Sequence, residues 1–330
     1  MTRKPRLPRE KTALILEGGG AKGAFEAGVI KYIHEKKIPV DIVCGTSVGA
    51  INAAAFAFKK VKDLIKFWSW ITPEHVYYPW PAHSLKDLLS FTHIFTNSPL
   101  EKTLRNIFNR VRMDKSPMPI VLTAFNLQKA TVETFDHKSK IDLVDVLMAS
   151  SAIQGIFPPR VIANQQYIDG GNGDNLPLKY AIDEGCKRLI VARCNIPKNN
   201  GDGTYNSFFE IVERSFISHF DYMSREDIRR ANKISEYVKR QAKKDEAVIG
   251  LLEEKIKDKA LLSNLKAKIA LMPSVIPEKY EIDIMVIEPD FMPIEIMEFE
   301  SDASRRLLDH GYEKAEEILT AKSVELAESL

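Results

Sequence analysis

The pentapeptide Gly45-Thr46-Ser47-Val48-Gly49 joins a short apolar segment, residues 40–44, to an alanine-rich helical segment, residues 48–58. A serine in a G-x-S-x-G sequence sits on a sharp turn from a strand into a helix, and the two glycines leave room for that turn. The N-terminus of the following helix also favours negative charge beside the serine. Ser47 is therefore a candidate nucleophile, with Gly45 and Gly49 as motif residues. The alternative is a tight turn whose small residues serve only packing.

Apolar runs of strand type alternate with segments of helical spacing along most of the chain. Alternation of this kind is typical of parallel sheets covered by helices. It predicts an α/β fold, with a mainly parallel central sheet flanked by helices on both faces. One helix is predicted to start with Ser98 as its N-cap and Glu101 as its capping-box partner. Strands are predicted at residues 12–16, 40–44, 119–126, 131–135, 166–168, 188–192 and 281–287, and further helices at residues 23–37, 48–58 and 302–320.

The chain divides by composition into four predicted parts. Residues 1–11 are basic, contain two prolines and predict a flexible tail. Residues 12–200 carry the alternating pattern and predict the catalytic core. Residues 201–275 are dense in charge, with apolar residues at helical spacing and no convincing strand, and they predict a helical insertion. Residues 276–330 predict a strand and a helix that complete the core.

Charge and hydropathy exclude several classes of protein. The net charge of +2 gives no strong field for nucleic acid, so no nucleic-acid partner is predicted. The longest apolar stretch, residues 50–58, is far shorter than the ~20 residues that span a bilayer. The basic N-terminus is followed by no apolar region, so no secretory signal is predicted. Cys44, Cys186 and Cys194 are an odd number in apolar strands, which favours a reducing compartment. We expect a cytoplasmic location.

The sequence Gly18-Gly19-Gly20-Ala21-Lys22-Gly23 follows the first predicted strand and fits G-x-G-x-x-G. In a dinucleotide-binding protein, an acidic residue ends the second strand. Here Asp41 lies near the start of that strand, which counts against this alternative. In an oxyanion hole, the N–H groups of Gly19 and Gly20 would point at a carbonyl oxygen that Ser47 attacks. Lys22 would add positive charge there, or be a solvated lysine at a helix start.

A serine nucleophile needs a proton acceptor within hydrogen-bond reach. None of the seven histidines stands in a glycine-rich context at the end of a strand. Asp169 does, since it ends the strand 166–168 and precedes Gly170 and Gly171. In a dry site a carboxylate accepts a proton more readily than in water. The alternatives are that Asp169 only caps a turn, or that Asp174 is the base.

The three sequences GGGAKG, GTSVG and DGG, in this order, resemble the patatin-like phospholipase family. The resemblance extends to the small residues 149–152, to residues 157–159, and to Asn175 and Pro177. It covers roughly residues 14–192. The chain departs from the family pattern at Gln154 and in its lysine-rich helical segment.

The resemblance implies a catalytic role for particular residues and a core without a metal or other cofactor. It implies a Ser–Asp dyad of Ser47 and Asp169. It also implies an oxyanion hole that includes Gly18, Gly19, Gly20 and Lys22, with Gly23, Gly45, Gly49, Gly170 and Gly171 as further motif residues. The expected fold is patatin-like, a modified α/β-hydrolase type with a nucleophile elbow.

The function expected is that of a serine acyl hydrolase, which cleaves phospholipid or related carboxylic esters through an acyl-enzyme. The partner is a lipid ester, and the oligomeric state is left open. One alternative is an acyltransferase that uses the same dyad. The other is a nucleotide-binding module built on the glycine-rich loop.

Two segments bear on how a lipid would reach the site. Aromatic residues gather in residues 67–95, which hold all three tryptophans. These aromatic residues are predicted to line an acyl-chain pocket or to form a lid over it. The alternative is that they only pack between helices in the core. Residues 233–268 interleave lysine and arginine with acidic residues. They form a solvated helical face, or else they attach the protein peripherally to an anionic membrane surface.

Overall fold

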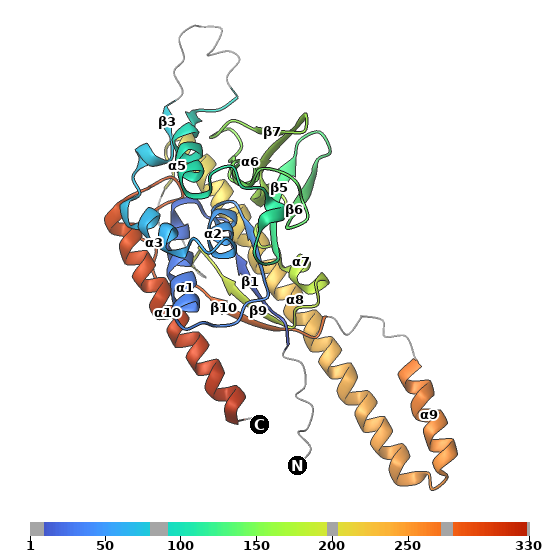
Figure 1. Cartoon of the computed structure of the whole chain (residues 1–330). Helices are drawn as coiled ribbons and strands as arrows, with labels where there is room; N and C mark the ends of the chain where they lie inside the picture. The colour runs from blue at the N-terminus through green and yellow to red at the C-terminus, as the bar shows by residue number, and fades with distance from the viewer. Residues whose placement is uncertain (1–9, 80–91, 197–203, 272–279, 329–330) are drawn as a thin grey trace.

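The computed structural model describes residues 10–79, 92–196, 204–271 and 280–328. Its centre is a large sheet with helices on both faces (Figure 1), as the alternation of segments predicts. A small antiparallel pair, β3 with β4, lies apart from that sheet. Within the described ranges, no helix is both long enough and apolar enough to cross a bilayer.

One side of the sheet is parallel, in the order β10-β9-β1-β2-β5. This confirms the mainly parallel sheet. Because β1 and β2 are parallel neighbours, the turns that follow them open at the same edge. These strands are β1 (Thr12–Leu16), β2 (Ile42–Thr46), β5 (Ile120–Asn126), β9 (Arg188–Ala192) and β10 (Asp283–Ile287).

The other side of the sheet is antiparallel. Strands β6 (Thr131–Asp136) and β8 (Gln165–Asp169) both run against β5, and β7 (Arg160–Ile162) runs against β8. The turn from β7 to β8 consists of Ala163 and Asn164, with φ of 48° and 62°. Positive φ at both positions matches the twist of a two-residue hairpin. The hairpin therefore sends β8 back against the direction of the parallel strands.

Successive residues of β1 point into two different cores. Leu14 and Leu16 belong to the larger buried cluster, and Ala13 and Ile15 to the smaller one, as the two-residue period of a strand requires. The helices α1, α2, α3, α5, α6 and α10 supply most of the larger cluster, whereas α7 covers the smaller one and α8 contacts both. The remaining elements are α1 (Ala24–Glu35), α2 (Val48–Ala57), α3 (Val61–Trp70), β3 (Tyr78–Pro79), β4 (Phe95–Thr96), α5 (Ser98–Phe108), α6 (Leu143–Ser150), α7 (Leu178–Asp183), α8 (Phe208–Lys255), α9 (Lys259–Leu271) and α10 (Ser301–Glu328), with short 3-10 turns η1 (Gly20–Gly23), η2 (Pro73–His75), η3 (Met113–Lys115) and η4 (Gly170–Asn172).

Helices α8 and α9 fall within the segment predicted to be helical. A capping box starts α8, since the Glu210 N–H donates to Ser207 Oγ and the Ser207 N–H donates to the Glu210 carboxylate. The first two-thirds of α8 pack on the core, where Phe220 and Val238 are buried. The last third of α8 and α9 project from the body as a helical hairpin, residues 240–271 (Figure 1). The division of the chain into four parts stays a prediction.

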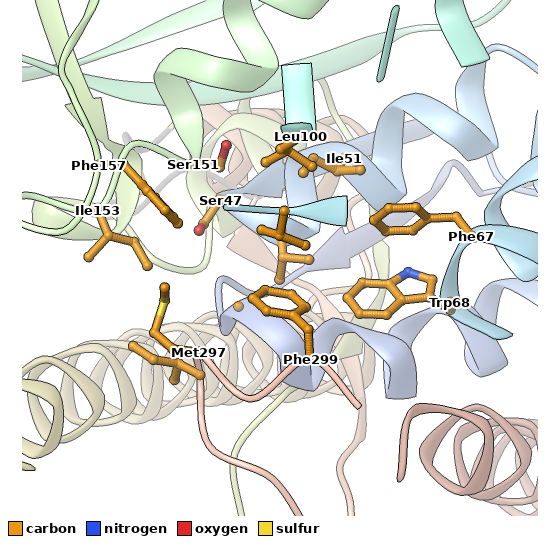
Figure 2. Close-up of a pocket in the computed structure, with 14 residues that line it drawn as sticks. Ser47, Ile51, Phe67, Trp68, Leu100, Ser151, Ile153, Phe157, Met297 and Phe299 are labelled. Atoms are coloured by element: carbon orange, nitrogen blue, oxygen red, sulfur yellow. The ribbon is translucent and has the colours of Figure 1, made fainter. Parts of the chain in front are cut away.

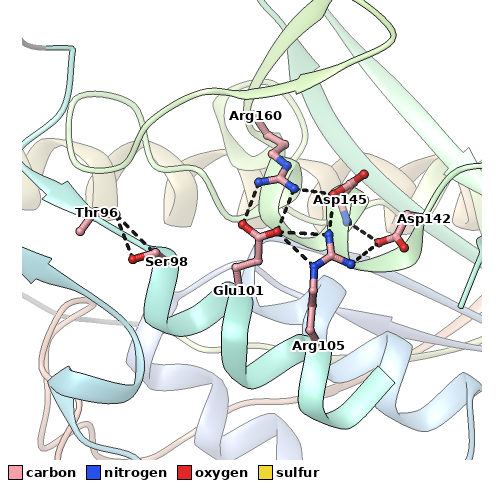
Figure 3. Close-up of polar contacts among 7 residues, drawn as sticks. All are labelled: Thr96, Ser98, Glu101, Arg105, Asp142, Asp145 and Arg160. Carbon is pink, nitrogen blue, oxygen red and sulfur yellow. Dashed lines mark hydrogen bonds and ion pairs between the residues drawn. The ribbon is translucent and has the colours of Figure 1, made fainter. Parts of the chain in front are cut away.

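A network of ion pairs fixes α5 to α6 and β7 (Figure 3). The Glu101 carboxylate pairs with Arg105 at 3.1 Å and with Arg160 at 2.9 Å, and both arginines also reach carboxylates at the start of α6. The prediction of a capping box at this helix is wrong. The helix already includes Ser98, and Glu101 is held by the two arginines instead of by the backbone.

Candidate active site

Ser47 stands between β2 and α2 in a backbone conformation that residues other than glycine rarely adopt. Its φ is 57° and its ψ is −126°. The surroundings hold it there. The Ser47 N–H donates to Ser150 Oγ over 2.8 Å. Gly49 packs so closely on β1 that an added Cβ would lie 2.5 Å from the Leu16 carbonyl oxygen. The turn from strand into helix is therefore present, and strained turns of this kind cluster at functional sites.

The antiparallel direction of β8 carries Asp169 to Ser47. Thr46, the last residue of β2, is level with Thr123 of β5, and the next residue of β5, Ala124, is level with Asp169. The Ser47 hydroxyl donates a hydrogen bond of 2.6 Å to Asp169 Oδ2. The structure thus brings the predicted nucleophile and the predicted base into direct contact.

The Asp169 carboxyl is fully buried. Loss of hydration disfavours its charged form and raises its pKa to about 7, even though hydrogen bonds from Ser47 and from the Gly171 N–H oppose the rise. The Gly171 bond is 2.8 Å long and ends on the second carboxylate oxygen, Oδ1. A carboxylate with a pKa near 7 accepts a proton far more readily than one with the ordinary value of ~3.9.

Two backbone N–H groups of the glycine-rich loop have no partner among the described residues. The Gly18 N–H donates to the Asn175 carbonyl oxygen over 3.2 Å. The N–H groups of Gly19 and Gly20, by contrast, donate to no acceptor in the described part of the chain. Gly20 also lines the same pocket as Ser47. Of the three glycines expected at an oxyanion hole, Gly19 and Gly20 have free donors, and Gly18 has none.

Gly20 is the residue of the loop whose backbone conformation itself requires glycine. Its φ is 57°, and a Cβ there would lie 2.1 Å from the Ile296 carbonyl oxygen. The same carbonyl oxygen accepts the Ala21 N–H over 2.9 Å. The loop is therefore pressed against a segment that comes about 270 residues later in the chain.

Lys22 is buried, with 2% of its side chain exposed. Its ammonium group lies 3.3 Å from the Glu295 carboxylate, and it also interacts electrostatically with Glu213 of α8. Lys22 is not a solvated lysine, and it does not line the pocket beside Ser47.

The other motif glycines are also points of close approach. At each of them an added Cβ would lie less than 3 Å from a neighbouring atom, which forces a shift. Gly23 approaches Val48, Gly45 approaches Gly49, Gly170 approaches Thr123 and Gly171 approaches Asn175.

Asp174, the alternative base, lies elsewhere. Its main-chain oxygen accepts a hydrogen bond of 2.9 Å from Thr46 Oγ1, and its side chain lines a separate cavity together with Asp227. Burial and the nearby Asp227 carboxylate raise the pKa of Asp174 to about 7. No described histidine lines the pocket beside Ser47. Among the described residues, no group of three or more histidine, cysteine, aspartate or glutamate side chains is placed to hold a metal ion.

A sequence profile of the family described as patatin-like phospholipase matches residues 14–182, about half of the chain. The chain belongs to the patatin-like phospholipase family. The family resemblance seen in the sequence is thereby confirmed.

Several curated relatives share part of this family domain. The chain is 26% identical over 218 residues to lysophospholipase NTE1 of Kluyveromyces lactis, covering 63% of this chain and 14% of that protein. It is 27% identical over 193 residues to human patatin-like phospholipase domain-containing protein 6, covering 54% and 13%. The chain therefore spans about one-seventh of the length of these relatives. The crystal structure of VipD from Legionella pneumophila aligns with a TM-score of 0.42 at 16% identity, covering 95% of this chain and 67% of that one.

A narrow pocket with a cavity volume of about 30 Å³ lies beside Ser47 (Figure 2). Ligand sites usually have about 300–1,000 Å³, so side chains of the walls must move before an acyl chain fits. Ser47 and Ser151 are its polar side chains, and all its other side chains are apolar. The walls come from α2, α3, α5, the segment after α6 and the connection from β10 to α10.

The aromatic segment of the sequence contributes one wall of this pocket. Phe67 and Trp68 of α3 line it, and the Trp68 indole N–H donates to Asn52 Oδ1 over 3.0 Å, so Trp68 is also part of the core. Trp70 points to solvent and is 70% exposed. Trp80 and Phe91 lie outside the described residues. Trp68 is therefore both a wall of the pocket and part of the core, so these two interpretations of the segment do not exclude each other.

Sequence reasoning missed two side chains that hold the site. Ser150 fixes the Ser47 N–H, as described above. The Asn175 side-chain amide donates to the Gly18 carbonyl oxygen over 3.3 Å and to Ser224 Oγ of α8 over 3.2 Å. Asn175 thus ties the glycine-rich loop to the Asp-Gly-Gly turn and to α8. Both residues stand in motifs quoted for the family resemblance, but no spacing indicates their partners.

Proposed function

We propose that this chain is a serine acyl hydrolase of lipid carboxylic esters, in which Ser47 is the nucleophile and Asp169 the general base. The observation that carries the proposal is the 2.6 Å hydrogen bond from Ser47 Oγ to the buried Asp169 carboxylate, beside an apolar pocket. A serine with a base in contact, next to free backbone donors, is the arrangement that acyl transfer needs.

The geometry supports a two-step reaction. As Ser47 Oγ forms a bond to the acyl carbon, its proton passes to Asp169 Oδ2, and the carbonyl oxygen becomes an oxyanion. The N–H groups of Gly19 and Gly20 stabilise that oxyanion. The bond from the acyl carbon to the alcohol oxygen then breaks, and the alcohol leaves with the proton from Asp169. Water then attacks the acyl carbon of the acyl-enzyme and gives a proton to Asp169. The bond from the acyl carbon to Ser47 Oγ breaks, Ser47 Oγ takes the proton back from Asp169, and the fatty acid leaves.

The pocket and one relative support a lipid ester as the substrate class. Its apolar walls suit an acyl chain, and the two serines stand where the ester group would lie. The relative from Kluyveromyces lactis is named a lysophospholipase, which supports a lipid ester as the substrate of this chain. The glycine-rich loop is covered by the Ile296 carbonyl, which favours this function over a phosphate cradle for a nucleotide.

A fluorophosphonate probe is expected to label Ser47 covalently, because its phosphorus mimics the acyl carbon and the dyad activates only this hydroxyl. Peptide mapping after labelling identifies the modified serine. Ser151 is an internal control, since it lines the same pocket but donates its hydroxyl to the Leu147 carbonyl oxygen. Labelling of Ser151 or of another serine in place of Ser47 would contradict the proposal.

Products from a lysophospholipid panel, with and without an added alcohol acceptor, then separate hydrolysis from acyl transfer.

The rate of this labelling is expected to depend on pH through Asp169. The base acts only when ionised, and its pKa is raised to about 7. Labelling should therefore be fastest above pH 7 and fall about tenfold per pH unit well below it. Labelling rates from about pH 5 to pH 9 test this. A rate that stays constant down to pH 5 would mean that Asp169 is not the base or is ionised throughout.

We further propose that the helical hairpin, residues 240–271, contacts an anionic membrane surface. It carries eight basic residues against five acidic ones. Leu251 and Leu261, on its two helices, are 59% and 50% exposed. A cationic, partly apolar surface is typical of peripheral attachment to lipid.

The double variant Leu251→Ser, Leu261→Ser is expected to bind vesicles that contain anionic lipid about tenfold or more weakly. The reason is that burying each of these exposed leucines in the lipid is worth about 1.5 kcal/mol or more. Vesicle sedimentation measures the bound fraction. Val161→Ser is the matched control, since Val161 is 58% exposed on β7, away from the hairpin. Equal binding by all three proteins would rule out this role. Deleting the whole of α8 is unsuitable, because its first half is core.

A further inference from the structure

The connection from β10 to α10 forms one wall of the pocket. Residues 295–299 of this connection are here called the strap. Their side chains alternate, with Glu295 and Glu298 exposed and Ile296 and Phe299 buried. Ile296, Met297 and Phe299 all line the pocket. Figure 2 shows Met297 and Phe299 on the side of the pocket opposite Leu100. The strap lies outside the residues that match the family profile.

Three contacts hold the strap on the glycine-rich loop and on the aromatic segment. The Ile296 carbonyl oxygen accepts the Ala21 N–H over 2.9 Å and lies against Gly20. The Met297 carbonyl oxygen accepts the Tyr77 hydroxyl over 3.0 Å. The Glu295 carboxylate lies 3.3 Å from the ammonium group of Lys22. The strap is therefore tied to the same loop that carries the free N–H groups of Gly19 and Gly20.

We infer that the strap sets the length of acyl chain that the pocket accepts, and that Lys22 is a positioning residue that clamps it to the glycine-rich loop. This inference rests on the proposed function. Met297 and Phe299 are the bulky side chains of the strap within the pocket, so their size limits the space for an acyl chain. Lys22 does not line the pocket, so its charge acts by holding Glu295 and, with it, the Ile296 carbonyl over Gly20.

The first experiment shortens the two bulky side chains with which the strap lines the pocket. Met297→Ala and Phe299→Ala should each raise kcat/KM for long-chain over short-chain p-nitrophenyl esters by about tenfold, since one or two methylenes in an apolar pocket are discriminated by this much. The series runs from butyrate to palmitate. Phe299→Leu is a milder variant in case Phe299→Ala unfolds. Met292→Ala is the matched control, a partly buried methionine of the same connection that does not line the pocket, and its profile should equal that of wild type.

The second experiment tests the clamp by a double-mutant cycle of Lys22→Met and Glu295→Gln. If Lys22 and Glu295 act as a clamp, each single variant broadens the dependence of kcat/KM on acyl-chain length. The double variant then broadens it no further than either single variant does. Lys22→Arg should restore the profile of wild type. A direct contribution of Lys22 to the oxyanion predicts something else, a lower kcat by the same factor for every chain length in Lys22→Met, with Glu295→Gln unaffected.

The possible results distinguish a failure of the proposed function from a failure of the proposed role of the strap. If wild type hydrolyses no ester of the series, the proposed function fails. If wild type is active but Met297→Ala, Phe299→Ala and Phe299→Leu keep its chain-length profile, only the role of the strap fails. Additive effects in the cycle would overturn the clamp while leaving the wall in place.

Discussion

Ser47→Ala and Asp169→Asn are each expected to lower kcat for ester hydrolysis by about 10⁴-fold or more, because nucleophile and base act as one unit. Ser47→Ala removes the atom that forms the acyl-enzyme. Asp169→Asn keeps the size of the side chain and its acceptor for the Gly171 N–H, but it takes no proton from Ser47. Turnover of a lysophospholipid, followed by fatty-acid release, measures both variants. A double variant should be no slower than either single one.

The same aspartate variant gives a control for folding. The folded-state pKa of Asp169 is raised to about 7, above the value of ~3.9 for an unfolded chain. The buried carboxylate therefore destabilises the folded state as pH rises from about 4 to about 7, by up to about 4 kcal/mol. Asparagine has no charge to bury, so Asp169→Asn should be more stable than wild type near pH 8 and equal to it near pH 4. An inactive variant that is also less stable at pH 8 would point to misfolding, not to loss of a base.

Gly20→Ala is expected to lower kcat by about 10²–10³-fold, the usual cost of one oxyanion donor. The added Cβ would meet the Ile296 carbonyl oxygen at 2.1 Å, so the loop must move, and the N–H groups that we propose as oxyanion donors move with it. Steady-state kinetics with an ester of short acyl chain measure the loss.

Gly185→Ala is the matched control for this variant. Gly185 also has positive φ, at 82°, but an added Cβ there meets nothing within 4 Å. Both variants should lose about 1 kcal/mol of stability or more from the left-handed backbone. Only Gly20→Ala should lose turnover. A Gly20→Ala protein that folds and keeps the kcat of wild type would contradict the oxyanion role of this loop.

Local sequence was enough to predict the parallel half of the sheet and the turn that presents Ser47. Strands β1 and β9 appear at the predicted residues. These features depend on alternation of short apolar runs and on sterics within five residues of a turn, both of which are visible in a single sequence. The predicted capping box at Ser98 is absent because Glu101 pairs with Arg105 and with the distant Arg160 instead.

The partners of the candidate site residues came from parts of the chain that no local pattern connects. Local chemistry alone left Asp169 and Asp174 as alternatives for the base. Their difference arises from the antiparallel β8, which places Asp169 beside Ser47 and leaves Asp174 in another cavity. The catalytic roles of Ser47, Asp169 and the glycine-rich loop stay predictions until they are tested.

The sequence by itself determined the fold class, the family and the turn that carries Ser47, because each depends on residue type at short spacing. Only the tertiary structure decided three further matters. It placed Asp169 against Ser47 and raised its pKa by burial, it gave the N–H groups of Gly19 and Gly20 no acceptor within the described ranges, and it paired Lys22 with Glu295. The physical reason is that desolvation and contact depend on what packs around a group, and here the packing segments lie more than 100 residues apart in the chain.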